Sequence, residues 1–171
     1  MRKALDTFYQ ACGVIAGIFL ALIAGVILYQ VIGRNLGFGI PGVDDLAALF
    51  LVASAFLALA PTLRAGGHIR VNLLLQYLPQ SLRWLAELWC LGFGAALMGF
   101  LTYFTIDMAR ESLVYGDRAI GQLPILLWIP QAGAALGMLA LTIAFIDDFV
   151  AVIRREKPSY HDAEMDLQSE G

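Results

Sequence analysis

The residues that could do chemistry gather in one stretch, Arg64-Ala65-Gly66-Gly67-His68-Ile69-Arg70-Val71-Asn72, which follows directly on an uncharged apolar run. The stretch combines two guanidinium groups with one imidazole. Acid–base catalysis or metal binding would need carboxylates, cysteines or further histidines beside them, and this stretch has none. Gly66 and Gly67 allow a helix to end and the chain to turn, because glycine tolerates positive φ. We interpret the stretch as an elbow between helices, with His68 as a polar residue at the level of the lipid headgroups.

The remaining reactive side chains are few. The only histidines are His68 and His161, and the only cysteines are Cys12 and Cys90. A haem-carrying helical bundle would need histidines paired inside the helices. Both cysteines lie in or beside apolar runs, a position that suits neither a disulfide framework nor a metal site. The sequence therefore predicts a protein that is not an enzyme and that carries no cofactor.

The composition indicates a membrane protein. Hydrophobic residues make up 60% of the 171 residues and charged residues only 15%, whereas soluble domains are about 45–50% apolar and about 25% charged. Lipid is therefore the expected solvent. The net charge of −3, with no basic cluster, gives no indication of nucleic acid as a partner.

Four uncharged runs are long enough to cross a membrane, which takes about 17–25 apolar residues. They cover residues 7–33, 46–63, 88–106 and 119–146. The sequence predicts an all-α domain over residues 1–158 whose four transmembrane helices cover about 10–33, 44–64, 84–107 and 122–153. Pro61 lies where it would kink or finish the second helix.

Two segments are predicted to stay outside the membrane core. The apolar run from Ile69 to Leu78 is too short to cross and is predicted to lie along the membrane surface between the second and third helices. The acidic residues 159–171 are predicted to form a disordered tail.

The basic residues predict the orientation, because cytoplasmic loops of membrane proteins carry an excess of lysine and arginine. Three basic residues fall on one side: Arg34, Arg110 and Arg118. The other eight share the second side: Arg2, Lys3, Arg64, Arg70, Arg83, Arg154, Arg155 and Lys157. This excess predicts a multi-pass membrane protein with both termini and the elbow in the cytoplasm.

Charged residues flank the turn between the first two helices. Asp44 and Asp45 open the second helix, where carboxylates cap free amides and favour the positive end of the helix dipole. A role as ion ligands is the alternative. Arg34 is close enough in sequence to form an ion pair with either aspartate across the short turn.

Small residues form a ridge along the first helix. Gly13, Gly17, Ala21 and Gly25 recur every four residues and so share one helix face. In lipid, helices associate through close backbone approach at such small residues. The ridge is predicted either to pack the four helices together or to dock a second membrane protein.

No predicted span carries a charged residue at its centre, where ion-coupled carriers normally place acids, bases or broken helices. Two alternatives to a structural role remain open. A self-sufficient small carrier would need an acid embedded in the membrane. A membrane-anchor subunit of a redox enzyme would need haem histidines or a quinone pocket.

Several motifs, in this order, resemble the small membrane (DctQ-like) subunit of tripartite ATP-independent periplasmic (TRAP) transporters. They are Arg34-Asn35, Asp44-Asp45-Leu46, the elbow from Arg64 to Val71, Leu123-Pro124 and Trp128-Ile129-Pro130. The resemblance implies a small permease subunit in the bacterial inner membrane. This subunit would brace a large membrane subunit, which itself carries the substrate and sodium sites. It also implies a periplasmic binding protein that delivers an organic acid anion, such as a C4-dicarboxylate or a sialic acid. The candidate structural and partner-binding residues are Arg34, Asp44, Asp45, Gly66, Gly67, His68, Arg70, Gly13, Gly17 and Gly25.

Overall fold

The structure, a computed structural model, describes residues 2–38, 41–64, 80–121 and 123–154. Its helices are α1 (Arg2–Leu36), α2 (Val43–Leu57), α3 (Leu59–Arg64), α5 (Gln80–Tyr115) and α6 (Trp128–Ile153). The predicted elbow after Arg64, the surface segment and the acidic tail lie outside the described residues, and with them Gly66, Gly67, His68 and Arg70.

The described residues contain four helical stretches that are long and apolar enough to cross a membrane. They are Leu5–Leu36, Val43–Arg64, Trp84–Tyr115 and Trp128–Ile153. The predicted all-α fold with four spans is therefore confirmed. The fourth helix begins at Trp128, not near residue 122, because the residues before it form a turn. In that turn the amide of Ala119 donates to the carbonyl oxygen of Ile125 at 2.8 Å.

The second span is interrupted where the sequence places a proline. Helix α2 ends at Leu57 and α3 begins at Leu59. Pro61 has no amide hydrogen, so the carbonyl of Leu57 loses its usual helical donor. The chain continues in the helical direction, because the amide of Thr62 donates to the carbonyl oxygen of Ala58 at 3.1 Å. Pro61 therefore accompanies the interruption between α2 and α3, and the two helices together form one candidate span.

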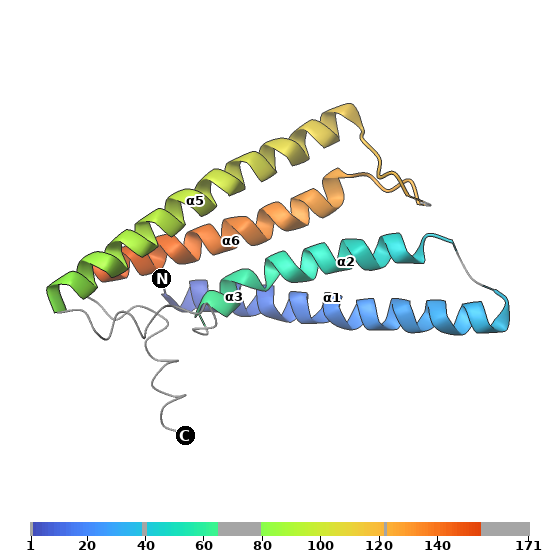
Figure 1. Cartoon of the computed structure of the whole chain (residues 1–171), viewed down its shortest axis with the longest axis horizontal. Coiled ribbons are helices and arrows are strands. Elements are labelled where there is room, and N and C mark those ends of the chain that lie inside the picture. Colours follow the sequence, from blue (N-terminus) through green and yellow to red (C-terminus); the bar gives the residue numbers. More distant parts are fainter. Residues whose placement is uncertain (1, 39–40, 65–79, 122, 155–171) are drawn as a thin grey trace, which may run out of the picture.

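The helices lie side by side in the order α5, α6, α2, α1 (Figure 1). Helix α6 packs against α5 on one side and against α2 and α3 on the other. In α6, 44% of the most apolar stretch is buried, against 11% in each of the other three spans. Helix α6 is thus the centre of the fold, and the outer helices leave most of their apolar surface uncovered.

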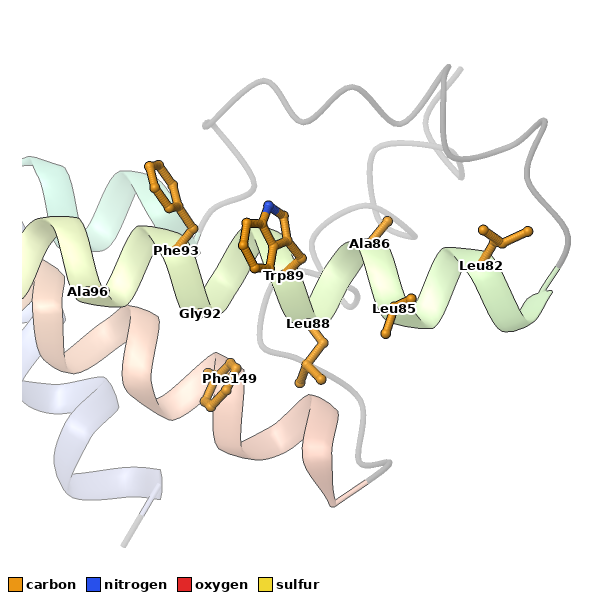
Figure 2. Close-up of a pocket in the computed structure, with 9 residues that line it drawn as sticks. All are labelled: Leu82, Leu85, Ala86, Leu88, Trp89, Gly92, Phe93, Ala96 and Phe149. Carbon is orange, nitrogen blue, oxygen red and sulfur yellow. The ribbon is translucent and has the colours of Figure 1, made fainter.

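Close helix contacts depend on glycine. A Cβ at Gly137 of α6 would lie 2.4 Å from the backbone carbonyl of Phe56 in α2. A Cβ at Gly92 of α5 would lie 3.1 Å from the ring of Phe149 in α6 (Figure 2). At Gly137, only a residue without a side chain lets the two backbones approach this closely, whereas at Gly92 a Cβ would crowd the Phe149 ring. The glycines of α5 and α6 therefore pack helices within this chain.

Polar side chains inside the spans bond across helices. The hydroxyls of Thr102 in α5 and Thr142 in α6 lie 2.9 Å apart. Ser54 of α2 donates to the carbonyl oxygen of Ala16 in α1 at 2.9 Å. Such bonds contribute about 0.6 kcal/mol each inside membranes. They fix the register of neighbouring helices.

Candidate functional site: charged contacts at the two ends of the helices

An arginine joins three helices at the end of the fold where α3 stops. One nitrogen of the Arg64 guanidinium forms an ion pair with Asp6 of α1, and the other donates to Asp147 Oδ2 of α6 at 2.8 Å. The guanidinium carbon lies 4.5 Å from the centre of the Tyr9 ring. We call Arg64, Asp6, Asp147 and Tyr9 the Arg64 junction.

Burial strengthens this junction. The Arg64 side chain is 15% exposed, and Asp147 is 29% exposed. A planar guanidinium can serve two carboxylates and an aromatic face at once, which a lysine could not match. Asp148, the next residue of α6, is 1% exposed. The last turns of α6 therefore carry two neighbouring carboxylates, Asp147 and Asp148, at the end of the fold where α3 stops.

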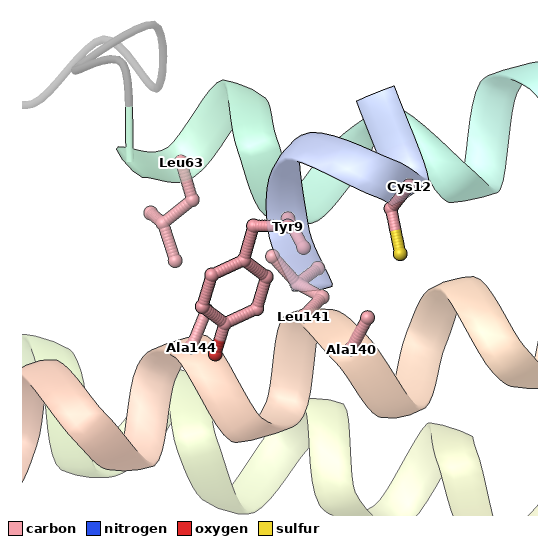
Figure 3. Packing of buried hydrophobic residues seen from close by; sticks show 7 residues of the cluster. Tyr9, Cys12, Leu63, Ala140, Leu141 and Ala144 are labelled. Carbon is pink, nitrogen blue, oxygen red and sulfur yellow. The ribbon is translucent and has the colours of Figure 1, made fainter. Parts of the chain in front are cut away.

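An apolar cluster (Figure 3) shares Tyr9 with the junction. Tyr9 belongs to both, with its ring among the apolar side chains and its face under the guanidinium. The cluster is formed by Tyr9, Cys12, Ala60, Leu63, Ala140, Leu141 and Ala144. The ion pairs and the apolar cluster therefore hold the same three helices together.

At the opposite end, an aspartate secures the turn before α6. Asp45 Oδ2 accepts a hydrogen bond from the amide of Leu123 at 3.0 Å. A Cβ at Gly121 would lie 2.6 Å from the same carboxylate. Gly42 has φ of 86°, and a Cβ there would lie 2.4 Å from Leu123 Cγ. Glycine at both positions lets the turn lie against the start of α2.

The candidate residues around the first turn have different environments. Arg34 is exposed near the end of α1, and within the described residues no ion pair joins it to Asp44 or Asp45. Asp44 is exposed, whereas Asp45 is half-buried. The Arg34–aspartate contact favoured by sequence proximity is thus replaced by the Asp45–Leu123 hydrogen bond.

The small-residue ridge of α1 divides into two parts. A Cβ at Gly13 would lie 3.5 Å from the Pro61 side chain, so Gly13 packs inside the chain. Within the described residues, a Cβ at Gly17 or Gly25 would meet no atom within 4 Å. Internal packing therefore applies to Gly13, whereas docking of a second membrane protein by Gly17 and Gly25 stays a prediction.

The sequence analysis missed three members of the Arg64 junction. Asp6 and Asp147 are the charged residues that bound the first and fourth uncharged runs, and Tyr9 lies one helical turn after Asp6. The sequence feature that could have identified them is that all three lie near the span ends predicted on the same side of the membrane as Arg64. Within the described ranges, no group of three or more histidine, cysteine, aspartate or glutamate side chains could hold a metal ion. The charged contacts tie helices together.

These features define a multi-pass α-helical membrane protein whose charged side chains gather at the ends of its spans. The sequence profile described as "Tripartite ATP-independent periplasmic transporters, DctQ component" matches residues 23–155. The chain belongs to this family, the small membrane component of TRAP transporters. Comparison with curated proteins and with solved structures gave no match.

Proposed function

We propose that this chain is the small permease subunit that braces the large membrane subunit of a TRAP transporter. Together with a periplasmic binding protein, the pair would take up an organic acid anion with sodium as the coupling ion. Family membership supports the subunit assignment. The cargo, the sodium coupling and the bracing role are part of the proposal.

The observation that carries the bracing role is the open row of helices. Helices α6 and α2 have neighbours on both sides, whereas α1 and α5 form the two edges of the row (Figure 1). Close packing between helices in lipid is stabilising wherever backbones can approach. The edge helices offer long surfaces on which a second helical protein can pack.

The two alternatives lack a supporting observation. A self-sufficient carrier needs a charged or titratable group near the membrane centre. The charges of the Arg64 junction lie instead near the start of α1 and the ends of α3 and α6. A redox anchor needs axial ligands such as histidines within its spans, and both histidines of the sequence lie outside the four spans. We therefore favour the subunit role.

Co-purification tests the proposal. The chain carrying an affinity tag should retain the large TRAP subunit through detergent extraction when the two are expressed together. A tagged, unrelated four-span protein expressed with the same large subunit is the control. Recovery of the large subunit at the level of the control would contradict the bracing role.

A further inference from the structure

An apolar groove of about 770 Å³ runs along α5 where this helix begins. Its lining is entirely apolar: Leu82, Leu85, Ala86, Leu88, Trp89, Gly92, Phe93, Ala96 and Phe149. All but Phe149 come from α5, and Leu88 and Phe149 lie between the two helices (Figure 2). The volume falls within the range of about 300–1,000 Å³ that is typical of small-molecule sites. A groove whose lining exposes almost no polar surface suits an aliphatic ligand.

The groove lies at the end of two spans. The candidate span of α5 begins at Trp84, and the candidate span of α6 ends at Ile153. The indole nitrogen of Trp84 donates to the carbonyl oxygen of Val152 at 3.3 Å, which joins these two ends. Tryptophan is enriched at membrane–water interfaces. The mouth of the groove is therefore at headgroup level.

The length of the groove matches one leaflet. Leu82 and Ala96 are separated by about 21 Å along the helix axis, at 1.5 Å per residue. One leaflet is about 20–22 Å thick when its headgroup region is included. A partner transmembrane helix would run through both leaflets and leave half of its length outside the groove. An acyl chain enters from the headgroup region and ends within one leaflet, as the groove does.

A basic residue follows the last turn of α6, at the end of the helix pair where the groove begins. Arg154 caps the end of α6, two residues after the carbonyl that accepts from Trp84, and it is exposed. A basic side chain at the membrane surface attracts anionic lipids. Farther into the groove, Trp89 is 74% exposed and stacks on Phe93 with ring centres 6.5 Å apart. This aromatic pair provides a flat wall for a hydrocarbon chain.

We propose that the groove binds one acyl chain of an anionic phospholipid, with Arg154 beside the headgroup. This inference goes beyond the proposed transport function, since the groove would bind lipid in the isolated protein as well as in the complex. Binding of the acyl chain would stabilise the packing of α5 against α6 at this end of the fold.

Photolabelling tests the proposal. The detergent-solubilised full chain receives one equivalent of phosphatidylglycerol with a diazirine on its acyl chain, or of the matching phosphatidylcholine. Trypsin then releases fragment 84–110 from α5 and fragment 4–34 from α1, both rich in exposed apolar residues. Label should concentrate in fragment 84–110, and phosphatidylglycerol should exceed phosphatidylcholine about fivefold, the effect of one basic residue near an anionic surface.

Three variants separate chain binding from charge. Arg154→Gln should remove the preference for phosphatidylglycerol and keep the label in fragment 84–110. Ala96→Phe fills the groove and should reduce labelling by both lipids. Ala24→Phe, the same change at an exposed position of α1, is the matched control and should leave the labelling unchanged.

Equal labelling of the two fragments, or labelling that Ala96→Phe does not reduce, would overturn the proposal. Label in fragment 84–110 of the isolated chain that disappears in the co-purified complex would show that a partner helix occupies the groove, and would overturn it as well. Failure of the chain to bind a large subunit would contradict only the proposed transport role.

Discussion

The guanidinium of Arg64 and the carboxylate of Asp147 meet at 2.8 Å, although 83 positions separate them in the sequence. Their contact joins the end of the second span to the last turns of α6, the central helix. Because the guanidinium also pairs with Asp6 and lies over Tyr9, one side chain holds three helices at this end of the fold.

Replacing Arg64 by alanine should therefore lower the stability of the protein. The pair is partly buried, so the loss should fall between that of an exposed pair and that of a buried one, about 1–3 kcal/mol. Thermal unfolding in detergent measures this as a lower Tm. Arg110→Ala is the matched control, because Arg110 is exposed and forms no ion pair within the described residues.

A double-mutant cycle isolates the contact. Arg64→Ala combined with Asp147→Asn should destabilise less than the sum of the two single changes, since each single change already removes the ion pair. Strict additivity of the two effects would show that the 2.8 Å contact contributes nothing to stability.

The Asp45–Leu123 hydrogen bond makes a prediction at the opposite end. Asp45→Ala leaves the amide of Leu123 without its acceptor, which costs about 1–3 kcal/mol for a buried group. Hydrogen exchange of residues 117–127 should accelerate, as followed by mass spectrometry. Asp44→Ala is the matched control, because Asp44 is exposed and accepts no such bond. Equal acceleration by both variants would contradict the assigned role of Asp45.

The sequence predicted the spans well because membrane crossing is a local property. An uncharged run of sufficient length marks each helix, and Pro61 marks the break in the second span. The partners of Arg64 could not be predicted from the sequence, since Asp6 and Asp147 are distant from it in the chain and contact it only after the helices pack. For the same reason, nearness in sequence favoured Arg34 as the partner of Asp45, whereas folding brings Leu123 there.

The division of the α1 ridge predicts opposite phenotypes for two neighbouring glycines. Gly13→Leu should force α1 away from Pro61 and lower the Tm of the isolated chain, since overpacking costs about 1–3 kcal/mol. Gly17→Leu should leave that Tm unchanged, because no atom of the described residues lies within 4 Å of a Cβ at this position. If the open part of the ridge docks the large subunit, Gly17→Leu should reduce co-purification. Unimpaired co-purification would place the docking surface elsewhere.

The excess of basic residues predicts the membrane orientation. Single cysteines at positions 39 and 116 should react with an impermeant thiol reagent in intact cells, in a background that lacks Cys12 and Cys90. Cysteines at positions 66 and 159 should react only after the membrane is opened. Labelling of position 159 in intact cells would reverse the predicted topology.

The central claim is that this chain serves a transporter and does not transport alone. Uptake into liposomes under an inward sodium gradient tests it most directly, with radiolabelled C4-dicarboxylates and sialic acid as candidate cargo. We expect no uptake by the chain alone, and uptake only when the large subunit and the loaded binding protein are both present. Sodium-driven uptake by the isolated chain would contradict the account.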